Sequence, residues 1–361
     1  ASAFVSGLPP YSIDLNWKDY DTSYKQEESN MFYHTNIVHD YFTSGGVFDV
    51  YALDYQMPAT VNIGATCNAY YDGYSINFFA ASESCESTAL SSDVIYHEYT
   101  HGMVDKVITI DFPYWGETGN MNEAFADYYA CAINNDPCMS DWTFFGNQCL
   151  RSCQNTNRHP QNYNDEPHSG SEIISGAIWD MRQVLGISVD EMAIMALKLQ
   201  PQTFKELLEN FLIVDDDNGD LSDGTPNINV ICHSFYDNHG VASPYCADYT
   251  DIPLVILDYP PQGSVLGGVV SLLGTAAPSR TDMGSFRYEI YADFNQVYSS
   301  TQPVVDGVLY DLDTFDLIDG WSNIELRAYE PGNSIMDMVS VDINVFVDNI
   351  LTITPLNSDI Y

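Results

Sequence analysis

The sequence pattern changes near residue 250, and this change constrains the fold more than any other feature. Before it, helical patterns follow capping boxes such as Thr203-x-x-Glu206. After it, short alternating apolar runs such as 286–291 are separated by turn residues at sandwich-like spacing. We therefore predict an α+β domain over residues 1–249, with a β-rich first part and a mainly helical later part. An all-β sandwich is expected over residues 250–361.

The chain of 361 residues carries 51 Asp and Glu against 11 Lys and Arg, which gives a formal charge of −40 at pH 7. Nucleic acids and anionic membranes both require a basic face, so we expect neither as a partner. Apolar residues make up 45% of the chain, which indicates a folded core rather than an acidic disordered tail. The sequence begins with Ala, as expected of a processed mature form. It has no run of roughly 20 apolar residues that could insert into a membrane.

Eight cysteines, all before residue 250, constrain the compartment. An even number with close neighbours indicates disulfides formed in an oxidising location, and we therefore expect a secreted, extracellular protein. A thiolate zinc site is the alternative, but the chain contains no C-x2-C pair. Sequence alone leaves about 105 pairings open. Pairing of nearest neighbours predicts the disulfides Cys67–Cys85, Cys131–Cys138, Cys149–Cys153 and Cys232–Cys246.

Residues 97–101 read H-E-Y-T-H, the H-E-x-x-H pattern, within a stretch that we expect to be helical. Positions i and i+4 lie on one helix face, so His97 and His101 can bind one metal ion. Glu98 can then lean toward the open position of that ion. Zn²⁺ there lowers the pKa of a bound water to about 7, and a carboxylate can accept its proton. On its own this short pattern could also be a solvated helix face with two incidental histidines.

A second predicted helix, residues 121–133, supplies a third ligand. Glu123 is the candidate, since catalytic zinc commonly binds two histidines, one carboxylate and a water. Asp127 lies one turn later on the same face, where it could hold the other ring nitrogen of His101. The sequence therefore predicts a zinc site made of His97, His101 and Glu123.

Three segments carry a family resemblance. Residues 93–101 read D-V-I-Y-H-E-Y-T-H, residues 114–123 read Y-W-G-E-T-G-N-M-N-E, and residues 68–73 read N-A-Y-Y-D-G. With these segments the chain resembles the thermolysin-like and fungalysin-like zinc endopeptidases, the gluzincins, over roughly residues 30–240. The resemblance implies a zincin-like fold for the first domain, synthesis as a zymogen, and hydrolysis of extended polypeptide substrates.

By this resemblance, Glu98 is the general base, and Tyr114 and His168 bind the oxyanion that forms on the former carbonyl oxygen. Tyr163 stands where thermolysin has the aspartate that orients this histidine, so Asp165 or Glu166 would have to replace it. The other similar positions contact the substrate: an edge strand holds its backbone, an arginine binds a carbonyl, and two apolar residues line the pocket after the scissile bond. These positions are Asn68, Ala69, Arg151, Val94 and Leu150.

An acidic run, residues 215–224, is dense in the oxygen ligands that Ca²⁺ binds. The EF-hand pattern fails there, because Asp220 occupies the position of its invariant glycine and Pro226 that of its glutamate. Asp93 matches a calcium ligand of thermolysin, but the companion acids do not align. Calcium is therefore a candidate second cofactor without an assigned site, and a solvated loop is the alternative for the run.

Two other functions stay open. A zinc aminopeptidase would belong to the same metal class, but the strand at residues 68–71 lacks the G-x-M-E-N pattern that holds a free amine. A non-catalytic adhesion or binding protein would have a vestigial zinc helix and rely on the sandwich, which we expect to be immunoglobulin-like. Against it, Glu98 and every predicted ligand are retained. We expect a secreted zinc endopeptidase that acts as a monomer and prefers an apolar residue after the scissile bond.

Overall fold

The computed structural model describes residues 25–43, 50–146, 149–280, 286–330 and 338–349. The chain divides into two compact units. Unit 1 comprises residues 1–219 and 238–241, and unit 2 comprises residues 220–237 and 242–361. Unit 2 begins before the boundary at 249/250 that the sequence pattern suggests, because the short helix α7 (Ile228–Cys232) groups with the strands that follow it.

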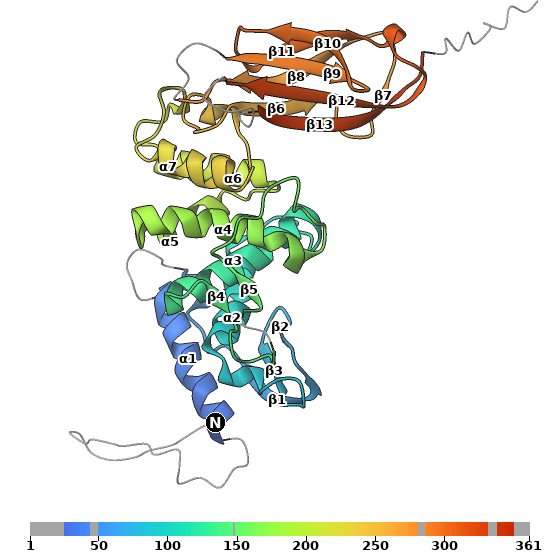
Figure 1. The fold of residues 1–361 in the computed structure, drawn as a ribbon. Helices are drawn as coiled ribbons and strands as arrows, with labels where there is room; N and C mark the ends of the chain where they lie inside the picture. Colours follow the sequence, from blue (N-terminus) through green and yellow to red (C-terminus); the bar gives the residue numbers. More distant parts are fainter. Residues whose placement is uncertain (1–24, 44–49, 147–148, 281–285, 331–337, 350–361) are drawn as a thin grey trace, which may run out of the picture. The chain divides into compact units, whose positions relative to one another are not determined.

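Helices form most of the described part of unit 1 (Figure 1). They are α1 (Lys25–Thr43), α2 (Ser92–Val107), α3 (Gly116–Asn134), α4 (Pro167–Leu185), α5 (Ser188–Lys198) and α6 (Phe204–Asp215). One half of the predicted capping box is present, since the Thr203 hydroxyl accepts the N–H of Glu206 at 3.1 Å and caps α6, while the Glu206 carboxylate accepts the N–H of Gln202 at 2.6 Å. Ser91 caps α2 in the same way. Helix α2 packs on α3, and α3 packs on α4, so α3 lies between two other helices.

A three-stranded sheet with the order β1-β3-β2 precedes α2. In it, β1 (Ala59–Thr66) runs parallel to β3 (Ile76–Ala80), and β2 (Ala69–Tyr71) pairs antiparallel with β3 at the edge. The run 70–80 alternates as a single strand would, but it forms two strands. The reason is Asp72, whose carboxylate accepts the N–H groups of Tyr74 and Ser75 at 2.9 and 2.6 Å and turns the chain.

The cysteine pairing differs from the nearest-neighbour prediction at two places. Cys67–Cys85 and Cys232–Cys246 are disulfides, as expected. The predicted pairs Cys131–Cys138 and Cys149–Cys153 are wrong, because Cys138 is bonded to Cys149. The cause is a short hairpin in which β4 (Cys138–Met139) pairs antiparallel with β5 (Arg151–Ser152) and brings segment 149–152 beside Cys138. Cys131 stays inside α3, and both it and Cys153 are buried without a disulfide.

A buried polar cluster around Asp190 ties four helices of unit 1 together. The Asp190 carboxylate on α5 accepts hydrogen bonds from the hydroxyls of Tyr41 on α1 and Tyr128 on α3. Its Oδ1 also lies 3.0 Å from Nε of Arg182 on α4. Tyr129 donates to the Asp190 backbone carbonyl at 2.6 Å. A fully buried carboxylate is stable only when it is paired and hydrogen-bonded, so this cluster fixes how the four helices meet.

Unit 2 is β-rich, and its strands form two main sheets. A five-stranded sheet has the order β10-β9-β12-β13-β7, and a three-stranded sheet has the order β11-β8-β6. The strands are β6 (Leu254–Tyr259), β7 (Val265–Leu266), β8 (Val269–Ala277), β9 (Arg287–Ala292), β10 (Asn295–Ser300), β11 (Val304–Asp313), β12 (Gly320–Tyr329) and β13 (Met338–Val347). Side chains of both sheets, such as Leu272 and Ile324, are buried in one apolar core. In the described residues, the region after residue 250 is therefore β-rich, as the sequence pattern predicts.

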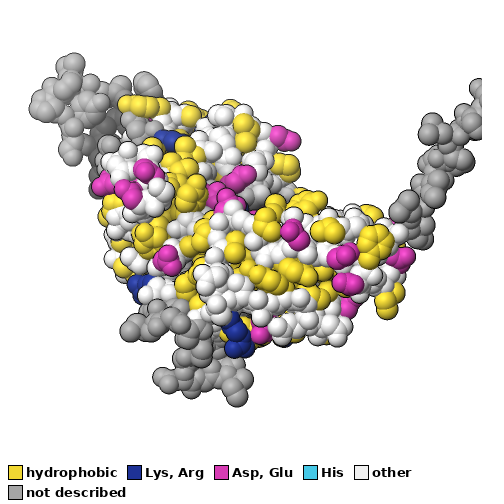
Figure 2. Space-filling view, turned by 90° about the horizontal axis from the view of Figure 1, so that it is seen from above, with side chains coloured by type: hydrophobic (Ala, Val, Ile, Leu, Met, Phe, Trp, Pro, Cys, Tyr) yellow, Lys and Arg dark blue, Asp and Glu magenta, His cyan; other side chains and the backbone are white. Residues whose placement is uncertain are grey.

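The acid excess is visible on the surface. Figure 2 shows one face of the molecule, on which Asp and Glu side chains are scattered and Lys or Arg appears at few places. None of the helices in the described ranges combines the length and the apolar character that crossing a bilayer requires.

Candidate metal centre

Helices α2 and α3 bring three predicted ligands to one point. His97 Nε2 lies 3.1 Å from His101 Nε2. Glu123 of α3 places Oε2 3.2 Å from His97 Nε2, and Oε1 3.5 Å from His101 Nε2. One ligand atom from each residue lies within 4.8 Å of the others. The arrangement follows from the H-E-x-x-H spacing, which puts both rings on one face of α2, and from the packing of that face on α3.

The outer nitrogen of each ring faces an oxygen of α3. His97 Nδ1 lies 2.8 Å from Asp127 Oδ1, and His101 Nδ1 lies 2.7 Å from Asn122 Oδ1. The prediction that Asp127 serves His101 is therefore wrong. The contacts run in opposite order along the two helices, so the later residue of α3 reaches the earlier histidine of α2. Asn122 is a site residue that the sequence reasoning missed, although it directly precedes the predicted ligand Glu123.

This arrangement directs electron pairs toward a common centre. An oxygen beside each Nδ1 atom favours the tautomer with the proton on Nδ1, and the Nε2 lone pairs then face each other; of the two contacts, the one between His101 and Asn122 has hydrogen-bond geometry. Glu123 Oε2 points to the same place and is buried, and no donor among the described residues meets it with hydrogen-bond geometry. Two lone pairs and a carboxylate oxygen within this distance repel one another unless a cation lies between them. The residues present can therefore hold a metal ion.

The pKa values of the two histidines also favour a cation at this place. Burial acts to lower the pKa of His97, but the carboxylates of Asp127 and Glu123 outweigh burial and raise the pKa to about 10. Burial lowers the pKa of His101 to about 4, so this ring stays neutral and offers a lone pair. The pocket thus stabilises one positive charge between the rings, which a metal ion can supply in place of a proton.

A cavity of about 620 Å³ adjoins this centre, and Glu98 lines it. The Glu98 side chain is buried, and this burial raises its pKa to about 7. A backbone hydrogen bond from Tyr71 of β2 acts in the opposite direction. The other predicted catalytic and substrate-binding residues line the same cavity, namely Asn68, Ala69, Val94, Tyr114, Leu150, Arg151 and His168. Asp127 does not line the cavity and lies behind the ring of His97.

Tyr114 and His168 approach Glu123 from separate segments. The Tyr114 hydroxyl donates to Glu123 Oε1, and His168 Nε2 lies 3.5 Å from the same oxygen. The other nitrogen of His168, Nδ1, lies 2.7 Å from Glu166 Oε1. Of the two acids that could orient this histidine, Glu166 makes the contact, while Asp165 accepts the hydroxyl of Tyr163 at 2.7 Å. Glu166 also caps α4, so its position is fixed by the helix that starts there.

Arg151 of β5 binds Asp127 with two hydrogen bonds. Nε donates to Asp127 Oδ2 at 2.6 Å, and Nη2 donates to Oδ1 at 2.7 Å. This fork is the geometry in which Arg–carboxylate pairs are strongest. Nη2 is also 3.8 Å from Glu123 Oε2. Two of the three guanidinium nitrogens, Nε and Nη2, are therefore engaged by carboxylates of α3.

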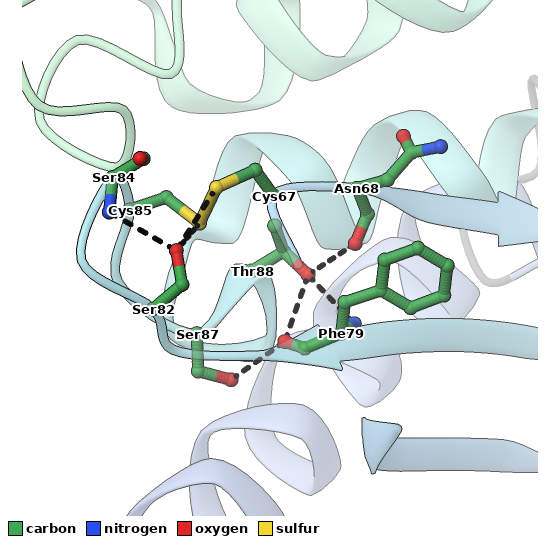
Figure 3. Close-up of a disulfide and its surroundings, with 8 residues drawn as sticks. All are labelled: Cys67, Asn68, Phe79, Ser82, Ser84, Cys85, Ser87 and Thr88. Atoms are coloured by element: carbon green, nitrogen blue, oxygen red, sulfur yellow. Dashed lines mark hydrogen bonds between the residues drawn. A yellow bond between two sulfur atoms is a disulfide. The ribbon is translucent and has the colours of Figure 1, made fainter. Parts of the chain in front are cut away.

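The edge strand β2 is held in place from one side. The carbonyl of Asn68 accepts the backbone N–H of Phe79 at 3.1 Å and the hydroxyl of Thr88 at 2.8 Å, as Figure 3 shows for Thr88. The adjacent Cys67–Cys85 disulfide fixes the same corner, where the Ser82 hydroxyl lies 3.3 and 3.4 Å from its two sulfur atoms (Figure 3). The opposite edge of β2 is not paired with another described strand.

The described residues offer no calcium site in the acidic run from which calcium was predicted. Two groups of His, Cys, Asp or Glu have metal-binding geometry there, and neither lies in the run 215–224. The second group, His233, Asp237 and Asp251, belongs to unit 2, and its carboxylates already accept hydrogen bonds. Asp237 accepts the N–H of Asp251 at 2.7 Å, and Asp251 accepts Nε of Arg280 at 2.6 Å.

Comparison with known proteins does not assign a family, since no family model matches the chain. Solved structures that are similar to parts of it include the following three. They are fibronectin(III)-like modules of CbhA from Clostridium thermocellum (20% identity, 27% of this chain and 98% of that chain, TM-score 0.20), an endo-beta-1,4-mannanase from Thermotoga petrophila (12%, 72% and 62%, TM-score 0.23), and an engineered protein (9%, 75% and 64%, TM-score 0.20). At these TM-scores none of the three bears on the fold or the function.

Proposed function

We propose that this chain is a secreted, zinc-dependent endopeptidase of the thermolysin-like and fungalysin-like type. Unit 1 would have a zincin-like fold, and unit 2 an immunoglobulin-like sandwich. The observation that carries the proposal is the convergence of His97, His101 and Glu123, with an acceptor oxygen behind each ring. Two imidazoles, one carboxylate and an adjoining cavity are the surroundings of a catalytic zinc with an open position. When bound, zinc supplies a Lewis acid and lowers the pKa of a water to about 7.

Glu98 is the proposed general base. Its carboxylate lines the cavity, and burial raises its pKa, which makes it a stronger proton acceptor for water and a source of that proton for the leaving amine. Tyr114 and His168 are the proposed donors to the oxyanion, because both reach Glu123 from the cavity. Glu166 keeps His168 in the orientation that turns Nε2 toward this centre.

The proposed substrate is an extended polypeptide. Strand β2 lies at the edge of its sheet beside the cavity, so a substrate strand can add to it through main-chain hydrogen bonds near Asn68 and Ala69. Val94 and Leu150 line the same cavity, which favours an apolar side chain after the scissile bond. Three disulfides favour an oxidising, extracellular location.

The test compares the wild type with Glu98→Gln, a change that keeps the size of the side chain and removes the base. Both proteins are analysed for bound metal and incubated with denatured casein, with and without a zinc chelator. We expect stoichiometric zinc in both and internal cleavage only by the wild type without chelator. Release of single amino-terminal residues would favour an aminopeptidase, and bound zinc without any cleavage by the wild type would favour a binding protein. A wild type that takes up no zinc would end the proposal.

A further inference from the structure

Cys131 and Cys153 meet beside the metal centre. Cys131 lies on α3, one turn after Asp127, and Cys153 follows β5, two residues after Arg151. Each residue is 1% exposed, and the Cys153 side chain lies close enough to the Cys131 thiol to raise its pKa. The other six cysteines are joined in three disulfides. These two thiols are therefore in contact with each other and shielded from solvent.

The backbone around both residues is fixed independently of their sulfur atoms. The carbonyl of Cys131 accepts the N–H of Asp136 at 3.0 Å, and the N–H of Cys153 donates to the carbonyl of Pro137 at 2.8 Å. Both cysteines are thereby anchored to the short turn that connects α3 with β4. The antiparallel pairing of β4 with β5 adds a second anchor on the Cys153 side.

The distance between Asp127 and Cys131 on α3 is similar to the distance between Arg151 of β5 and Cys153, which follows this strand. Asp127 and Cys131 are i and i+4 on a helix, with Cβ atoms about 5–6 Å apart. Arg151 begins β5 and Cys153 directly follows it; residues i and i+2 of a strand lie about 6.7 Å apart on the same side. The Arg151–Asp127 ion pair therefore brings Cys153 opposite Cys131, and a bond between the sulfurs would in turn hold Arg151 opposite Asp127.

We propose that Cys131 and Cys153 form a fourth disulfide in the secreted protein, and that this bond positions Arg151 on Asp127 behind the metal ligand His97. The positioning half of this statement rests on the proposed zinc site, while the disulfide does not. Cys131 and Cys153 are positioning residues in this sense, since neither lines the cavity.

The oxidation balances with a disulfide as the oxidant, such as glutathione disulfide or a thiol–disulfide oxidoreductase. The thiolate of one cysteine attacks the oxidant and forms a mixed disulfide with loss of one thiol. The second cysteine then displaces the other thiol, so that two electrons and two protons pass from the pair to the oxidant. In the folded chain, contact with Cys153 and burial raise the pKa of Cys131 well above its usual value and suppress its thiolate. The thiol–disulfide exchange therefore takes place during folding, before α3 and β5 bury the two sulfur atoms.

Peptide mapping tests the disulfide directly. The full chain, produced by secretion or refolded with glutathione disulfide, is denatured without reductant, alkylated, digested and analysed by mass spectrometry. We expect no alkylated cysteine and a linked peptide pair that contains Cys131 and Cys153. Alkylation of both these residues, with the other six protected, would overturn the proposal. This measurement requires neither zinc nor activity, so its result does not depend on whether the proposed function is correct.

The positioning role is tested with the double variant Cys131→Ser/Cys153→Ser. The matched control is Cys232→Ser/Cys246→Ser, which removes a disulfide of unit 2. Zinc affinity is measured by competition with a chromophoric chelator at a temperature at which both variants are folded. We expect at least tenfold weaker zinc binding for the first variant and wild-type binding for the control. Equal affinities in the two variants would refute the positioning role, and absence of zinc uptake by the wild type would refute the metal site while the mapping result stands.

Discussion

Asp127 makes the most informative single substitution, because it contacts both a metal-ligand candidate and a buried cation. Its Oδ1 lies 2.8 Å from His97 Nδ1, and its two oxygens accept the fork of Arg151 at 2.6 and 2.7 Å. The side chain is buried. Asp127→Asn keeps the shape of the side chain but removes its charge and one acceptor oxygen. The change therefore tests the electrostatic role of Asp127 with little change in packing.

Two effects of known size follow from this geometry. Breaking a buried ion pair by removing one partner costs about 3–5 kcal/mol. Glu123 lies 3.8 Å from Arg151 and partly compensates the guanidinium, so we expect the lower end, about 3 kcal/mol. In a unit of about 220 residues, this lowers the Tm by about 6–12 °C. Loss of a carboxylate behind a ligating histidine weakens metal binding by about 10–100-fold.

The assay measures thermal unfolding of the chelator-treated protein and, separately, zinc affinity by competition. The control is Asp190→Asn, which removes the charge of another buried carboxylate paired with an arginine, but on α5 and without contact to the ligands. We expect a lower Tm for both variants and weaker zinc binding only for Asp127→Asn. Wild-type zinc affinity in Asp127→Asn, or equal weakening in Asp190→Asn, would refute the reasoning.

Three further predictions concern the oxyanion donor, the metal and the packing of α4. Tyr114→Phe should retain zinc and lower kcat by about 10²–10³, with little change in KM, as measured by peptide hydrolysis. Zinc at a hundred times its Kd should raise the stability of the chelator-treated wild type by about 2.7 kcal/mol, measured from thermal unfolding, and should leave Glu123→Ala nearly unchanged. Gly176→Ala should destabilise the protein by about 1–3 kcal/mol in urea, because the new Cβ would overlap the His239 ring. Gly64→Ala, with no atom within 4 Å of the new Cβ, should cost much less.

The sequence was sufficient where local chemistry decides the outcome. The Thr203 cap of α6 and the alternating run 286–291, which forms β9, appear in the structure where the pattern predicts them. The two histidines of α2 share a face because the helical period requires it. Glu123 joins them because the two helices pack directly on each other. Predicting these features requires few assumptions about contacts between residues that are far apart in the sequence.

The sequence failed where two or more partners competed for one residue. Asp127 could serve either histidine, and only the order of contacts between α2 and α3 selects His97. Cys138 could pair with either neighbour, and the β4–β5 hairpin selects Cys149. The run 70–80 was long enough for one strand, but the hydrogen bonds of the Asp72 carboxylate favour a turn. In each case the deciding contact comes from backbone geometry that periodicity does not describe.

The buried charges around the centre explain why a doubly charged ion suits it. Glu98, Glu123 and Asp127 supply three carboxylates, whereas Arg151 supplies one permanent positive charge, so with neutral histidines the group has two uncompensated negative charges. Burial raises the pKa of Glu98 to about 7, and the Glu123 carboxylate acts in the same direction, so proton uptake by Glu98 reduces this imbalance when no metal ion is bound. Uncompensated buried charge costs several kcal/mol per ion, and a divalent cation removes that cost. Replacing Arg151 by a neutral residue would leave three negative charges, more than one divalent ion neutralises. Arg151 is thus required for charge balance as well as for the orientation of Asp127.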